Sequence, residues 1–135
     1  MPGASKETAP VVLDTPIHTI RAVELGEFTV MWETSHIDHD AAPIFKGLPE
    51  DRCPCPHWCV VTSGRTTMRY PDHEETFGPG EVFYCPPGHI PADTAGTEYI
   101  TFSPTAQLNE VMATVAKNLQ AARRESHVAE RARIQ

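Results

Sequence analysis

Residues 78–89 read GPGEVFYCPPGH, and this stretch shows the pattern that decides the fold. Gly78-Pro79-Gly80 predicts a turn, the next residues to Cys85 predict a short strand, and Pro-Pro-Gly ends that strand. The same rhythm occurs on both sides of the stretch. Strands are predicted at 17–32 with a bend at Gly26, and at 53–62, 65–70, 75–77, 81–85 and 97–102. Short strands separated by turn residues indicate an all-β sandwich or barrel rather than βαβ units.

A helix is predicted after the last strand, in SPTAQLNEVMATVAKNLQAARR. Ser103 is a candidate N-cap and Pro104 suits the first helical position. One helical face carries the apolar residues Leu108, Val111, Met112, Val115 and Leu119, and we expect it to pack on the β-domain or on a second subunit. The predicted organisation is a flexible arm (1–14), a β-domain (15–103), the helix (104–126) and a tail (127–135).

Composition indicates one ordinary globular domain. The 135 residues are 40% hydrophobic and 21% charged. No apolar run approaches the roughly 20 residues that span a bilayer, and the N-terminus lacks signal-peptide features, so we expect a cytoplasmic protein with no membrane partner. Residues 1–116 hold six basic and 16 acidic residues, a net charge of −10, which argues against nucleic-acid binding.

The stretch 78–89 resembles the second conserved motif of the cupin superfamily, which begins with a glycine and an acidic residue and ends at Pro-Pro-Gly. VVTSG at 60–64 resembles the strand end and hairpin glycine that close the first motif. More narrowly, KGLPEDRCPCPHWCVVTSG (46–64), PPGHIP (86–91) and FSPT (102–105) together resemble small single-domain bacterial cupins. The resemblance covers about residues 50–103 and implies an RmlC-like jelly-roll β-barrel followed by the C-terminal helix.

The cupin resemblance also implies where metal ligands would lie. Counted back from Gly64, the usual glutamate position is His57, and the two histidine positions are Cys53 and Asp51. In the second motif the usual histidine position is Pro91, while His89 lies two residues earlier. No usual ligand is retained unchanged, so the sequence indicates a reassigned ligand set.

The predicted ligands are Cys53, Cys55, His57 and His89. On a strand, alternate residues from 51 to 59 would point the same way, and Pro54 and Pro56 would place the strand start at an edge or rim. Thiolate and imidazole suit a divalent transition metal, zinc or iron above all.

The other thiols and imidazoles favour simpler interpretations. Cys59 and Cys85 lie in apolar strands and fit a core role. His36 and His39 fall in a loop-like segment, where solvation is favoured over ligation, and His18 can line the interior but has no evident partner in sequence. A disulfide between Cys53 and Cys55 fits poorly, because residues i and i+2 of a strand are too far apart. A redox switch that pairs one thiol with a distant one ranks below metal binding.

Several functions remain open at this stage. The first is a metal-dependent enzyme, of oxygenase, isomerase or lyase type, that acts on a small organic molecule in the barrel. The alternative is a non-catalytic cupin that binds a small ligand or a metal, as a sensor, a carrier or a structural dimer. We expect a homodimer in either case, because pairing covers exposed sheet edges.

Overall fold

The computed structural model describes residues 3–134, and in the helix beyond residue 121 it describes a side chain only at Arg124. Ten strands, two 3₁₀ turns and one helix follow one another along the chain. They are β1 (Val11–Asp14), β2 (His18–Leu25), β3 (Phe28–Ser35), β4 (His39–Asp40), η1 (Ala42–Phe45), η2 (Pro49–Asp51), β5 (His57–Ser63), β6 (Thr66–Arg69), β7 (Glu74–Phe77), β8 (Val82–Cys85), β9 (Ile90–Asp93), β10 (Glu98–Pro104) and α1 (Thr105–Ile134).

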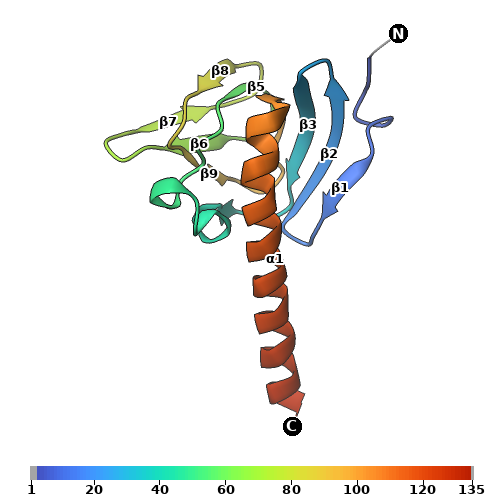
Figure 1. The fold of residues 1–135 in the computed structure, drawn as a ribbon, viewed down its shortest axis with the longest axis vertical. Helices are drawn as coiled ribbons and strands as arrows, with labels where there is room; N and C mark the ends of the chain where they lie inside the picture. The colour runs from blue at the N-terminus through green and yellow to red at the C-terminus, as the bar shows by residue number, and fades with distance from the viewer. Residues whose placement is uncertain (1–2, 135) are drawn as a thin grey trace.

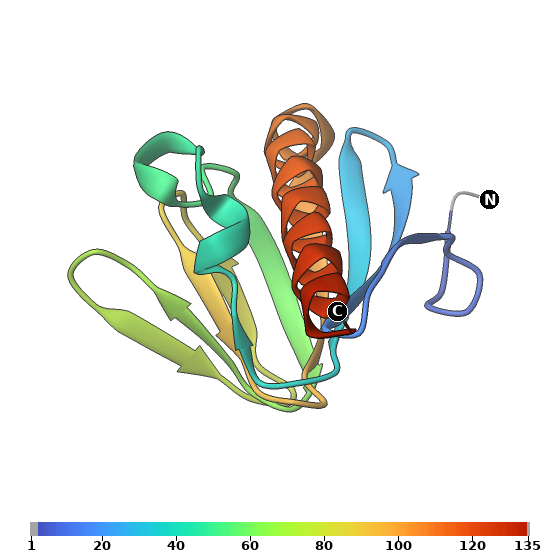
Figure 2. The same ribbon diagram turned by 90° about the horizontal axis from the view of Figure 1, so that it is seen from below.

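The strands form two antiparallel sheets that face each other. One sheet has the order β1-β2-β3-β10-β5-β8 and the other the order β4-β9-β6-β7. The prediction of an all-β jelly roll with a C-terminal helix is confirmed, although the sheets form a sandwich rather than a closed barrel. Figure 2 shows α1 lying in the opening between the two sheets, and Figure 1 shows its second half extending beyond them.

Gly64 lies in the turn between β5 and β6, where the chain passes from one sheet to the other. Its φ is +74°, in the left-handed region that favours glycine. A Cβ at this position would lie 2.4 Å from Cα and from Oγ1 of Thr97. The turn therefore requires glycine both for its backbone angle and for space, as the resemblance to the first cupin motif implied.

The strand predicted at 53–62 is shorter than expected. β5 begins only at His57, and residues 53–56 are not part of it. Pro54 and Pro56 have no N–H to donate to a neighbouring strand, and Cys53 makes only an isolated bridge with His89. The expected alternation of side chains from 51 to 59 is therefore wrong before His57, and Asp51 lies in η2 with φ +56°.

Both ends of the chain are more regular than the sequence indicated. The predicted arm 1–14 includes β1, which pairs with β2. The predicted tail is part of α1, which continues to Ile134. Ser103 is not the helix cap that the sequence suggested, because it lies within β10 and its hydroxyl contacts His57.

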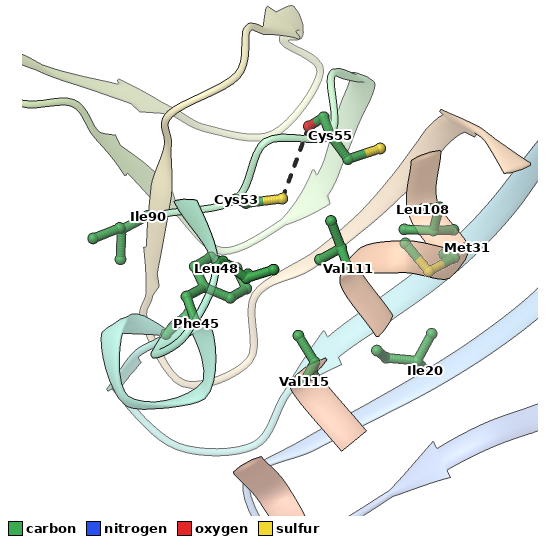
Figure 3. Packing of buried hydrophobic residues seen from close by; sticks show 11 residues of the cluster. Ile20, Met31, Phe45, Leu48, Cys53, Cys55, Ile90, Leu108, Val111 and Val115 are labelled. Carbon is green, nitrogen blue, oxygen red and sulfur yellow. Dashed lines mark hydrogen bonds between the residues drawn. The ribbon is translucent and has the colours of Figure 1, made fainter. Parts of the chain in front are cut away.

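The apolar face of α1 covers the open side of the sandwich, as predicted for the helix. Leu108, Val111 and Val115 are buried against Ile20 of β2 and Met31 of β3 (Figure 3). Phe45 and Leu48, beside the 3₁₀ turns, close the same cluster from the other sheet's side. No described helix is long and apolar enough to cross a membrane.

A second cluster fills the sandwich between β5, β6, β8 and β10. It contains Cys59, Val61, Met68, Phe83, Cys85 and Tyr99. All four cysteines are free thiols, and Cys59 and Cys85 have the core role predicted for them.

Candidate metal centre

A cavity of about 260 Å³ lies between α1 and the inner faces of the two sheets. This volume is just below the usual range of roughly 300–1,000 Å³ for ligand pockets, so an occupant would be small. The helix supplies an apolar wall through Leu108, Val111, Met112, Val115 and Leu119. The opposite wall carries polar groups, which are Cys53, His57, His89, His18, Glu33, His39, Asp93, Tyr99 and Thr101.

Three of the four predicted ligands meet in this wall. Cys53, His57 and His89 each offer one donor atom, and the three donor atoms lie within 4.8 Å of one another. Cys53 Sγ is 3.6 Å from Nε2 of His57, and the two imidazole rings are 4.9 Å apart between centroids. Cys53 precedes β5, His57 starts β5 and His89 follows the Pro-Pro-Gly turn, so the Cys53–His89 bridge brings both motifs together.

Outer hydrogen bonds orient both imidazoles for ligation. Nδ1 of His89 is 2.8 Å from the carbonyl oxygen of Pro86, which can only accept, so this nitrogen carries the proton. Nδ1 of His57 is 2.6 Å from the hydroxyl oxygen of Ser103. Nε2 of His89 therefore presents a lone pair to the cavity, as in metal-bound histidines, and Nε2 of His57 does so in the tautomer whose Nδ1–H donates to Ser103.

Burial keeps the group uncharged when no metal is bound. Burial, with help from neighbouring His89, lowers the pKa of His57 to about 3, and burial also lowers the pKa of His89. The pKa of the Cys53 thiol is raised to about 12, mainly by burial. Both imidazoles are therefore neutral and ready to ligate, while a metal ion must displace the thiol proton.

The remaining candidates from the two motifs lie outside this group. Cys55 is buried beside α1, and its thiol donates to the carbonyl oxygen of Pro56 over 3.4 Å. Figure 3 shows that Cys53 Sγ meets the carbonyl oxygen of Cys55 and not its sulfur. Asp51 caps a turn by accepting from the Gly47 N–H, so ligation by Cys55 or Asp51 stays a prediction without geometric support.

A second polar group lies deeper along the same wall. Donor atoms of His18, His39 and Asp93 are within 4.8 Å of one another, and Glu33 lies beside His18 with Nε2–Oε1 at 3.3 Å. The Thr101 hydroxyl donates to Glu33 over 2.9 Å. Thr101 and Ser103 are two residues apart on β10, so Glu33 and His57, which contact them, are neighbours along the same wall.

The sequence interpretation missed this second group. The expectation that His39 is solvated in a loop is wrong, because His39 lies in β4 and lines the cavity. His36, in contrast, is exposed and contacts Thr19. Asp93 lies on strand β9, which follows Pro-Pro-Gly and contains Pro91, so the local sequence does not predict a strand there.

Comparison with solved structures agrees with this architecture. The polyketide cyclase RemF from Streptomyces resistomycificus is 17% identical with a TM-score of 0.56, covering 77% of this chain and 79% of RemF. An RmlC-like cupin from Shewanella frigidimarina is 14% identical with a TM-score of 0.54, covering 77% and 91%. The chain has a cupin fold. The Fe(II) form of HppE is a further structural neighbour of this chain, at 9% identity and a TM-score of 0.53, covering 74% of this chain and 58% of HppE.

At these identities the likeness establishes only the fold of this chain, and its chemistry must be argued from the site. The sequence matches no protein-family model and no curated protein.

Proposed function

We propose that this cupin is a metal-dependent enzyme that acts on a small, partly apolar organic molecule. The observation that carries the proposal is the convergence of Cys53, His57 and His89 in a cavity wall, with both imidazoles already oriented by outer partners. Three protein ligands with a position open to a cavity are typical of catalytic metal sites, whereas structural zinc sites use four protein ligands.

The donor set fits a divalent transition metal, with zinc or iron as the favoured ions. The HppE structure named above contains Fe(II), which supports iron as one of the two. Bound at this site, such a metal would supply Lewis acidity toward a substrate oxygen. The proposed reaction is of oxygenase, isomerase or lyase type.

The chain's own residues would divide the remaining tasks. Ser103 and the Pro86 carbonyl hold the two imidazoles in place. The apolar face of α1 would bind the carbon skeleton of the substrate and exclude water from it. The Glu33 carboxylate, held by Thr101, lines the same polar wall and would accept a hydrogen bond from the substrate.

Elemental analysis after expression in zinc- and iron-supplemented medium tests the metal. The proposal predicts bound zinc or iron in the wild-type protein, and Cys53→Ser should hold up to one equivalent less metal than Cys55→Ser, its matched control. Less than a tenth of an equivalent of any metal in the wild-type protein would contradict it.

An open coordination position is tested with the cobalt-substituted protein. Azide is a small ligand that changes the visible absorption of Co(II) when it enters the coordination sphere. The proposal predicts a saturable change on azide addition. A cobalt spectrum that azide leaves unchanged would favour the alternative function, a closed metal site in a sensor, carrier or structural dimer. The homodimer and the cytoplasmic location stay predictions from the sequence.

A further inference from the structure

His18, His39 and Asp93 surround one point beside the cavity. The Ser35 hydroxyl oxygen lies 3.2 Å from Nδ1 of His18, 3.0 Å from Nε2 of His39 and 2.8 Å from Oδ2 of Asp93. His18, His39 and Asp93 also line the cavity, so an ion can reach them from it. Two imidazoles and one carboxylate that converge in this way form a known pattern for divalent transition metals.

Two of the three donors, His18 and Asp93, have a partner on the far side that would hold them in place. Nε2 of His18 is 3.3 Å from Oε1 of Glu33, which is the carboxylate–histidine arrangement found behind metal-bound imidazoles. The Thr66 hydroxyl donates to Oδ1 of Asp93 over 2.6 Å and leaves Oδ2 directed at the cluster. Thr101 in turn donates to Glu33.

The charge around this point also favours a cation. Asp93 is buried and Glu33 is half-buried on one cavity wall, and among the described residues no Lys or Arg forms an ion pair with either carboxylate. His18 pairs with Glu33, whereas the nearest approach of Asp93 to a potential cation is 3.9 Å, to His39. Buried carboxylates are stabilised by pairing or by metal ions. A dication would be neutralised by the two carboxylates together.

We propose that His18 (through Nδ1), His39 (through Nε2) and Asp93 form a second divalent metal site in the same cavity, with Glu33 as the outer partner of His18. The Ser35 hydroxyl gives up its bonds to the two imidazoles when the metal enters. This nitrogen and oxygen set suits harder ions such as Fe(II) or Mn(II) better than the thiolate-containing centre does. The second site does not depend on the first, since the two sets share no ligand.

Cobalt titration of the metal-free protein separates the two sites. Cobalt bound by a thiolate shows sulfur-to-metal charge-transfer absorption, and cobalt bound only by nitrogen and oxygen does not. The wild-type protein is expected to bind two equivalents, of which only one contributes that absorption. His39→Gln is expected to lose the equivalent without charge transfer and to keep the other, while Cys53→Ser shows the reverse.

Two further variants make the assignment specific. His36→Gln removes a neighbouring exposed histidine outside the cluster and should still bind two equivalents. Glu33→Gln should weaken the second site about 10–100-fold, the usual effect of losing an outer partner. His18→Gln provides a second ligand variant if His39→Gln unfolds, and circular dichroism confirms the fold of each.

Saturation of the wild-type protein at one thiolate-bound equivalent, unchanged by His39→Gln, would overturn the second site and leave the first intact. One equivalent without charge transfer, lost in His39→Gln and kept in Cys53→Ser, would support the second site and contradict the proposed function at the first.

Discussion

The neutral imidazole of His57 should make the metal-free protein sensitive to acid. Its pKa is about 3 in the folded protein, against an ordinary value of 6.5 in the unfolded chain. Between pH 6.5 and pH 3 the imidazole of His57 is therefore protonated in the unfolded chain and neutral in the folded protein. The free energy of unfolding must then fall as the pH decreases from 6.5 toward 3.

The size of the effect follows from the linkage relation. Each pH unit in this window is worth about 1.36 kcal/mol for one proton. At pH 4.5, two units below 6.5, His57 alone should lower the free energy of unfolding by about 2.7 kcal/mol relative to pH 7.5. A variant that lacks the imidazole should not show this loss of unfolding free energy at low pH.

The assay is urea denaturation with chelator present, at pH 7.5 and 4.5, for the wild-type protein and His57→Gln. The carboxylates titrate in both proteins, so the comparison isolates His57. The wild-type protein should lose about 2.7 kcal/mol more than His57→Gln between the two pH values. His36→Gln, an exposed histidine variant, should follow the wild type. Parallel losses in the wild type and His57→Gln would refute the assignment of a buried neutral imidazole.

Two further predictions concern the fold around the site. Gly64→Ala forces a Cβ to 2.4 Å from Thr97 and should lower the free energy of unfolding, measured by urea denaturation, by more than about 3 kcal/mol. In the control Gly26→Ala the new Cβ meets no atom within 4 Å, so the loss should be only about 1–2 kcal/mol. Equal losses would contradict the close approach at the β5–β6 turn. Val111→Ala removes buried methyl groups from the cavity wall and should lower the free energy of unfolding by about 1–3 kcal/mol. The control Glu110→Ala changes an exposed residue and should lower it by less than about 0.5 kcal/mol. A Val111 variant as stable as its control would show that α1 does not pack on the sandwich.

Local signals predicted much of this fold. The glycine at 64 and the Pro-Pro-Gly after β8 mark turns by their own backbone preferences, and they located the strands on either side. The cupin resemblance, counted from Gly64 and from the turn after β8, implied Cys53, His57 and His89 as ligands. These three residues meet because Cys53 bridges to His89 and because β5 pairs with β8, which sets His57 opposite Cys85.

The second group of polar residues depends on long-range strand pairing, which local sequence patterns do not predict. β4 has two residues and β9 contains a proline, yet their antiparallel register sets His39 opposite Asp93. Glu33 looks like one polar residue among others on β3, and only the folded sandwich directs it to His18. Cys55 lies outside the first group for a local reason, because Pro54 and Pro56 interrupt the strand that the expected alternation required.

The central claim is that Cys53 is a metal ligand at the centre formed with His57 and His89. The most direct test is the sulfur-to-cobalt charge-transfer absorption of the reconstituted protein, measured in Cys53→Ser and Cys55→Ser side by side. The account predicts that this absorption disappears in Cys53→Ser and persists at full strength in Cys55→Ser. Its persistence in Cys53→Ser, or its absence from the wild-type protein, would contradict the account.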